Sequence, residues 1–299
     1  MLETPKQQTG GRVPVMDCFT QAWRFLDKNW RLMLPAAAIT AALSQIGLVL
    51  VMMLRPAPTA GESMLAVTLW DLVAVAPAMV ASLMFTAAIL RKALRDEFIG
   101  PTGMAFGADE IRLLAVMAAL TCMILPLGGL FFLVVSTFVF SRIATTPEAL
   151  NALLADPEAL NAALEAALGP TGVLAFLLFF ILVMAIFLYV STRLVMVNAA
   201  TMGERRVVIF QTWSWSRGNV WRILGAVVLT GLPVMFFQGL LDSVGIEAVQ
   251  ATPEGSGRAM VQLGVSTVTT FLFAIAGIPS IALGAILYKG LRPGDFVAK

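Results

Sequence analysis

Long stretches of the chain carry no charged side chain, and the polar residues gather between them. Six runs contain no aspartate, glutamate, lysine or arginine: 32–54, 72–90, 113–141, 166–192, 223–241 and 259–288. A helix that crosses a bilayer needs about 20 apolar residues, and each run is close to that length or longer. Charges or Gly/Pro loops bound every run. The pattern predicts six transmembrane helices.

The composition supports this prediction. Of the 299 residues, 59% are hydrophobic and 13% are charged, whereas an ordinary soluble domain is about 25% charged. A soluble protein this apolar has too few polar residues to cover its surface, so lipid is the expected solvent for much of the chain. We expect an all-α integral membrane protein, with residues 1–14 as a flexible cytoplasmic tail and residues 15–299 as a single six-helix membrane domain.

The cationic residues predict the orientation of the six helices. Seventeen of the 20 lysines and arginines lie in the segments 1–31, 91–112, 193–222 and 289–299, which alternate spans place on one side. Only Arg55, Arg142 and Arg258 lie on the other side. Short loops rich in lysine and arginine stay in the cytoplasm, so both termini are predicted to be cytoplasmic. The composition also favours a bacterial source, which makes the inner membrane the expected location.

One cytoplasmic segment combines aromatic and cationic side chains just before the fifth run. It reads QTWSWSRGNVWR, residues 211–222. Tryptophan favours the headgroup region of a bilayer, and arginine can extend to lipid phosphates. We therefore predict lipid contacts at the interface from five of its residues: Trp213, Trp215, Arg217, Trp221 and Arg222.

The same segment predicts a sharp change of direction. Gly218 is placed to end a short surface helix in a left-handed conformation, with Arg217 in the last turn of that helix. Asn219 is then a candidate N-cap for the membrane helix that begins near Trp221. The predicted structure is an elbow, in which a helix lying on the membrane turns and enters it.

The N-terminal region repeats this pattern. Phe19, Trp23, Leu26 and Trp30 fall on one helical stripe and polar residues on another, which is typical of an interfacial amphipathic helix. Trp30-Arg31 matches Trp221-Arg222, and Trp23, Trp30 and Arg31 are predicted lipid contacts. A fainter copy at 111–113 precedes the third run, so the chain could consist of three elbow-plus-hairpin repeats. Alternatively, any helix that enters from the cytoplasm acquires tryptophan and arginine at its start.

The segment that begins at Glu204 also resembles a known family. The matching positions are Glu204, Thr212-Trp213, Ser216-Arg217-Gly218 and Trp221-Arg222. They are similar to the six-span membrane domain attached to some bacterial glycerophosphodiester phosphodiesterases, and to related stand-alone inner-membrane proteins of unassigned function. The resemblance implies an architecture and no activity, because the phosphodiesterase itself would need a separate soluble barrel with histidine ligands.

Three polar residues within or beside the apolar runs are candidates for a site inside the membrane. Asp71 lies next to Trp70 at the start of the second run. It could cap the helix or be solvated at the outer interface, and the alternative is that it binds a proton or a cation. Gln45 and Gln238 lie within the first and fifth runs. We expect these amides to hydrogen-bond between helices, and a solute site is the alternative.

The largest predicted loop spans about 142–169 and is acidic. It repeats the sequence Pro-Glu-Ala-Leu-Asn-Ala at 147–152 and 157–162, and Thr146 and Asp156 are good N-caps for two short helices. The helices could rest on the outer membrane surface or form a docking platform for a partner protein.

The sequence offers little material for catalysis. Histidine, the commonest general base and metal ligand, is absent from the chain, and we find no motif for a nucleotide, metal or other cofactor and no nucleic-acid patch. A non-enzymatic membrane scaffold that engages lipid and another membrane protein is the leading hypothesis. A small carrier or channel for a lipid, amphiphile or solute is the alternative, and a membrane enzyme comes third.

Overall fold

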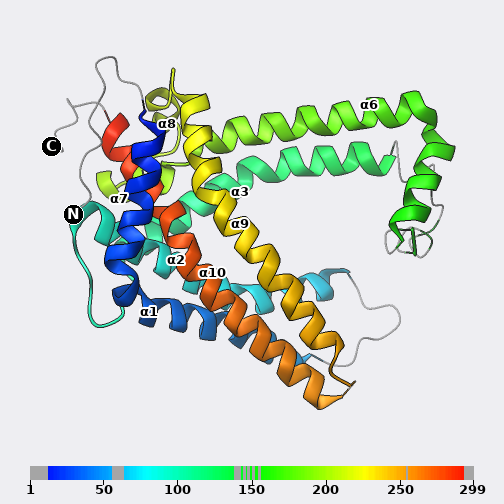
Figure 1. Cartoon of the computed structure of the whole chain (residues 1–299), viewed down its shortest axis with the longest axis horizontal. Coiled ribbons are helices and arrows are strands. Elements are labelled where there is room, and N and C mark those ends of the chain that lie inside the picture. Colours follow the sequence, from blue (N-terminus) through cyan, green and yellow to red (C-terminus); the bar gives the residue numbers. More distant parts are fainter. Residues whose placement is uncertain are drawn as a thin grey trace. The chain divides into compact units, whose positions relative to one another are not determined.

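The structure is a computed structural model that describes residues 13–55, 64–137, 156–253 and 255–292, with isolated positions between 143 and 153. The predicted tail lies outside these residues, apart from Val13 and Pro14. In the described part of the chain the helices are α1 (Val15–Leu54), α2 (Met64–Arg95), α3 (Ala108–Val135), α6 (Pro157–Leu194), α7 (Val197–Glu204), α8 (Gln211–Trp215), α9 (Val220–Gln250) and α10 (Ser256–Leu291) (Figure 1).

Six of these helices, α1, α2, α3, α6, α9 and α10, are long and apolar enough to cross a membrane. The predicted all-α fold with six transmembrane helices is therefore confirmed, and the chain is a multi-pass membrane protein. The helices extend beyond the charge-free runs. For example, α1 begins at Val15 and α9 continues to Gln250, past Asp242 and Glu247. Charged residues near the ends of long helices can reach the interface, so a charge does not mark the end of a helix.

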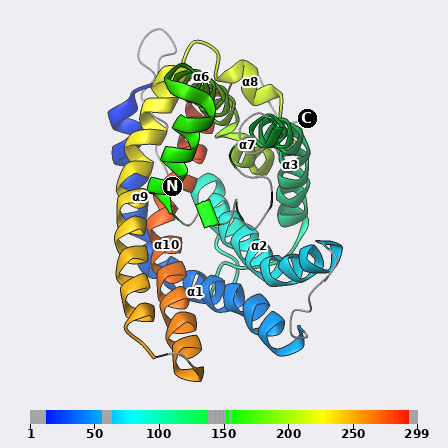
Figure 2. The ribbon, with the colours of Figure 1, turned by 90° about the vertical axis from the view of Figure 1, so that its right-hand side faces the viewer.

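The chain divides into two compact units, the first made of Met1–Val116 with Thr192–Lys299 and the second of Met117–Ser191. In the first unit α1 packs most extensively against α2 and α10, and α9 runs beside α10 (Figures 1 and 2). Small residues bring these helices close together, which is the usual basis of helix packing in membranes. At Gly47 a Cβ atom would collide with the backbone oxygen of Ala74 in α2, so only glycine fits there.

The second unit contains the apolar parts of α3 and α6. Phe131 of α3 stacks on Phe179 of α6, with ring centroids 5.9 Å apart, and also contacts Phe180 at 6.2 Å. Many of the other large apolar side chains of α6 are exposed, including Leu178 and Leu182. A helix that is apolar on all sides requires lipid or another protein around it.

The predicted N-cap at Asp156, in the outer loop, is confirmed. Its carboxylate accepts the backbone N–H groups of Glu158 and Ala159 at 3.0 and 3.1 Å. At Gly169 the backbone leaves the helical conformation (φ 65°, ψ 173°), and Pro170 follows. The label α6 thus joins a short helix before Gly169 to the span after it, and Figure 1 shows the turn between them. Much of the first repeat, 147–152, lies outside the described residues.

The predicted elbows appear in two forms. Residues 15–54 form one continuous helix, α1, which contains Pro35 and changes direction part-way along (Figure 1). Proline removes one backbone hydrogen bond and bends a helix without ending it. At the second elbow the chain breaks: α8 ends at Trp215, Gly218 has a φ of +80°, and α9 begins at Val220. The left-handed Gly218 agrees with the prediction.

Candidate functional site

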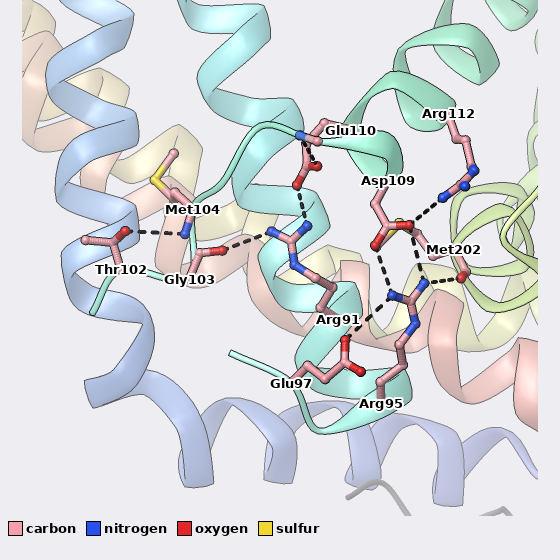
Figure 3. Close-up of polar contacts among 11 residues, drawn as sticks. Arg91, Arg95, Glu97, Thr102, Gly103, Met104, Asp109, Glu110, Arg112 and Met202 are labelled. Atoms are coloured by element: carbon pink, nitrogen blue, oxygen red, sulfur yellow. Dashed lines mark hydrogen bonds and ion pairs between the residues drawn. The ribbon is translucent and has the colours of Figure 1, made fainter. Parts of the chain in front are cut away.

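A cluster of charged side chains joins the end of α2 to the start of α3, around a buried ion pair. Arg91 and Glu110 form a salt bridge, and their side chains are only 2% and 1% exposed. Arg91 also donates a hydrogen bond to the backbone oxygen of Gly103, 3.0 Å away. The second carboxylate oxygen of Glu110 accepts the N–H of Gly107 at 2.9 Å. Figure 3 shows that these contacts hold the 96–107 loop against both helices.

The position of Glu110 follows from the local sequence. The first N–H groups of a helix have no partner within the helix, and a glutamate at the third helical position can reach back to the N–H of the cap residue. Glu110 is the third residue of α3 and Gly107 precedes the helix. Once buried, this carboxylate requires a positive partner, because an unpaired buried charge is strongly destabilising. Arg91 supplies that charge.

A second group of contacts ties α7 to the same helices. Arg95 donates to the carboxylate of Asp109 at 3.0 Å and to the backbone oxygen of Met202 at 2.5 Å. Asp109 also accepts a hydrogen bond from Arg112 at 2.8 Å. As Figure 3 shows, Arg95 lies between Asp109 and Met202. The arginine therefore connects three segments of the chain, α2, α3 and α7.

The end of α10 is fixed to α7 and α2. The hydroxyl of Tyr288 donates to Glu204 at 2.6 Å, and Arg292 forms a salt bridge with the same oxygen at 3.0 Å. Lys289 donates to the backbone oxygen of Ala93 at 2.9 Å. At Gly203 a Cβ atom would come within 2.5 Å of the Tyr288 ring, so glycine is required where Tyr288 approaches α7.

The tryptophan-rich segment is held by an arginine at the end of α6. Arg193, which is buried, donates to the backbone oxygen of Trp213 at 2.9 Å and to the hydroxyl of Ser216 at 3.2 Å. Its guanidinium group lies 5.2 Å from the centroid of the Trp213 ring, within cation–π range. Thr212 is also buried, and its hydroxyl donates to the backbone oxygen of Ile209 at 2.7 Å. Arg193 thereby fixes α8.

The first residue that the structure describes is clamped by the start of α9. The side-chain oxygen of Asn219 accepts the N–H of Val13 at 3.0 Å, and Arg222 donates to the backbone oxygen of Val13 at 3.4 Å. Asn219 occupies the N-cap position of α9 but makes no capping hydrogen bond with its side chain. The predicted role of Asn219 as a side-chain cap is therefore wrong, because its oxygen binds Val13 instead.

These contacts position helices, and most of their donors and acceptors are used within the protein; the buried Nε groups of Arg91 and Arg193 are the exceptions among the described residues. Within the residues that the structure describes, no three His, Cys, Asp or Glu side chains come close enough to hold a metal ion. Outside the spans, Asp96 accepts a hydrogen bond from Lys92, and this bond and the Lys92 charge lower the pKa of its carboxyl group. We infer that the cluster is structural, and that the functional surface lies elsewhere on the chain.

The three predicted intramembrane residues lie on different helices and in different surroundings. Asp71 lies inside α2, which begins at Met64, and its side chain is exposed. The capping role considered for Asp71 is therefore wrong, and both solvation at the interface and proton or cation binding remain. Gln238 donates to Asp242 at 2.8 Å within α9 and not between helices, because one turn of helix brings the two side chains together. Gln45 is buried in α1.

The predicted interfacial residues divide into two groups. Trp213 contacts Arg193, the ring of Trp215 lies 6.0 Å from that of Tyr288, and Arg222 binds Val13. Trp23 is half-buried and contacts Phe19, with ring centroids 6.3 Å apart. Trp30, Arg31, Arg217 and Trp221 are exposed, and Arg31 lies over the Trp30 ring at 5.3 Å.

Sequence reasoning missed the ion pairs at the helix ends. Arg91 and Arg95 counted only as positive charge on the cytoplasmic side, and Glu204 only as one position of a motif. The spacing of Gly107 and Glu110 could have indicated the contact between them. The Tyr288–Glu204 contact joins residues 84 positions apart, and no local pattern signals it.

Comparison with protein-family models, with curated proteins and with solved structures found no match to this chain.

Proposed function

We propose that the chain is a non-enzymatic accessory or scaffolding protein of the bacterial inner membrane, with both termini in the cytoplasm, that engages lipid and another membrane protein. The proposal includes a relationship to the six-span membrane domain of bacterial glycerophosphodiester phosphodiesterases, supported by the motif that begins at Glu204. The tryptophan and arginine residues at the elbows support the lipid contact, and the 17-to-3 distribution of cations supports the orientation.

The observation that carries the proposal is the contrast between the two units. In the first unit, charged side chains cross-link α2, α3, α7 and α10 at one end. The described part of the second unit is a hairpin of apolar helices with phenylalanines between them and exposed aliphatic side chains along α6. A chain with one cross-linked unit and one apolar hairpin suits a protein that binds another helix within the membrane.

Photo-crosslinking from α6 tests the scaffold. A photoreactive amino acid at Leu178 or at Leu182, one helical turn apart on the same face, should give lipid adducts and one shared protein adduct in native membranes. The same amino acid at Ile286, which is buried in α10, is the control and should give neither. The experiment is repeated at the exposed Phe236 of α9. If all three positions gave lipid adducts and no protein adduct, the proposed protein partner would be ruled out.

A carrier for a lipid or amphiphile is the second candidate, because polar side chains are buried within two of the spans. Thr230 of α9 is fully buried, and its hydroxyl has no hydrogen-bond partner within the described residues. Gln45 of α1 is also buried. A bound solute could satisfy the Thr230 hydroxyl.

Lipid transfer across vesicles separates the two roles. Proteoliposomes with a fluorescent phospholipid and a membrane-impermeant quencher report movement between leaflets. A carrier predicts faster movement than in protein-free vesicles, and a loss of this movement in Gln45→Leu and Thr230→Val without a loss of folded protein. Equal rates with and without the protein would rule out transfer of this lipid and favour the scaffold.

A further inference from the structure

The tryptophan-rich elbow presents two exposed side chains, Arg217 and Trp221, on either side of the left-handed Gly218. Trp221 is 81% exposed, more than any other large apolar side chain described. The backbone of Arg217 is fixed by a hydrogen bond from its N–H to the oxygen of Ser214 at 3.2 Å. Within the described residues its guanidinium makes no ion pair. Because the backbone is fixed, the exposed cation and the exposed tryptophan are held in place to bind a ligand outside the protein.

The first half of α1 has the same character. Cys18, Ala22 and Phe25 form its buried face. The exposed face carries three cations and one acid: Arg24, Lys28 and Arg31, whose spacing of four and three residues places them on one helical stripe, and Asp27 beside them. In the part of the chain that the structure describes, none of the three forms a salt bridge. Trp30 is 40% exposed beside them, with Arg31 over its ring.

The start of the helix that carries these cations lies beside the elbow. The first turn of α1 lies beside the start of α9, where Val13 contacts both Asn219 and Arg222. Val15 also lies near α9, because a Cβ atom added to Gly225 would be 3.8 Å from its side chain. Both views of the ribbon show the start of α1 next to the start of α9 (Figures 1 and 2).

We propose that six residues form the contact with the membrane surface and select phospholipids with a net negative headgroup: Arg24, Lys28, Trp30, Arg31, Arg217 and Trp221. This inference rests on the proposed lipid engagement and specifies its ligand. The four cations form no salt bridge among the described residues, so the phosphate groups of anionic lipids can pair with them, and each cation near an anionic surface adds about fivefold to binding. The two tryptophans place their rings at headgroup depth.

Residues of the same type within the elbow have different surroundings. Arg217 and Arg222 belong to the same elbow, and Arg222 is the one that binds Val13. Trp213 and Trp221 also belong to the same elbow, and Trp213 is the one that stacks with Arg193. In each of the pairs Arg217/Arg222 and Trp221/Trp213, the first residue is therefore the test and the second is the matched control, because the same substitution can be made at both.

Tryptophan quenching in bilayers provides the measurement. The full chain keeps Trp221 alone, with the other five tryptophans replaced by phenylalanine. It is reconstituted in vesicles of equal amounts of phosphatidylglycerol and phosphatidylcholine, with bromine on the acyl chains of one lipid or the other. We expect Trp221 to be quenched more by brominated phosphatidylglycerol. Arg217→Gln should lower that preference by up to about fivefold, and Arg222→Gln should leave it unchanged.

The same quenching experiment applies to α1. There Trp30 is the single tryptophan, and the variant combines Arg24→Gln, Lys28→Gln and Arg31→Gln.

Equal quenching of Trp221 by the two lipids, or equal effects of Arg217→Gln and Arg222→Gln, would overturn the proposal. Loss of the preference when inorganic phosphate replaces chloride at matched ionic strength would assign the site to free phosphate instead. These results do not depend on the α6 crosslinks, so lipid selectivity and scaffolding can fail separately.

Discussion

Two neighbouring residues, Gly218 and Asn219, illustrate what a sequence reveals at the residue scale. Gly218 has the left-handed conformation that its position after a short helix predicts, because this requirement comes from the backbone itself. Asn219 stands at the predicted cap position, but its side chain binds Val13, 206 residues earlier in the chain. A side chain binds the donor or acceptor that lies nearest in space, and the local sequence does not show which residue that is.

Gly218→Ala should lower the stability by about 1–2 kcal/mol, the usual cost of a left-handed conformation for a residue with a Cβ atom. No atom lies within 4 Å of the position of that Cβ, so the cost comes from the backbone alone. Gly231→Ala is the control, since Gly231 lies in α9 and also has open space around it; it should be neutral or stabilising. Unfolding in detergent compares the two, and equal effects would contradict the left-handed turn.

The buried pair of Arg91 and Glu110 gives a second prediction at this scale. Arg91→Met or Glu110→Leu alone should cost about 3–5 kcal/mol, because each leaves a buried charge without a partner. The double variant should be more stable than either single variant, since it removes both charges. A double-mutant cycle from detergent unfolding measures this coupling, and additive effects would contradict the buried ion pair.

At the scale of the element, α1 shows why the number of spans was easier to predict than their limits. The polar–apolar stripes of residues 17–31 and the charge-free run 32–54 predicted two segments, and the structure joins them in one bent helix. The buried face in the first half uses Cys18, Ala22 and Phe25, and the predicted apolar stripe used residues 19, 23 and 26. Hydrophobicity located the apolar residues, but small side chains determine which face packs against other helices.

The clamp on Val13 predicts that Asn219 attaches the start of α1 to α9. Asn219→Ala should leave the buried N–H of Val13 without its partner, at a cost of about 1–3 kcal/mol. Asn219→Asp retains an oxygen acceptor and should cost less. Hydrogen exchange of the first turn of α1 in detergent reports the change, and faster exchange in α1 only is the expected result. Unchanged exchange in Asn219→Ala would show that the clamp does not hold the segment.

For the whole molecule, the separation of charges provides more information than the net charge of +2. The prediction of six helices and their approximate positions needed only the charge-free runs, whereas the cross-links among α2, α3, α7 and α10 depend on tertiary proximity. The candidate site was predicted only in part: exposed tryptophans and arginines were identified, but which of them the protein itself uses was not.

The predicted orientation rests on the 17-to-3 distribution of lysine and arginine. A reporter enzyme that is active only outside the cytoplasm should be silent when fused after Lys299 and active when inserted near Asn151. A reporter active only in the cytoplasm should give the complementary result at both sites. Activity of the first reporter after Lys299 and its silence near Asn151 would reverse the orientation.

The arrangement of contacts along the chain also sets an order of events during synthesis. The Arg91–Glu110 pair spans 19 residues, so it can close when only the first three helices have left the ribosome. One main partner of α1, α2, follows it directly in the chain, whereas the clamp on Val13 needs Asn219 and the rest of the packing of α1 needs α10, the last helix described. The packing of the N-terminal helix is therefore completed only when the last described helix has been made. A chain that stops before α10 leaves α1 with α2 but without the other of its two main partners.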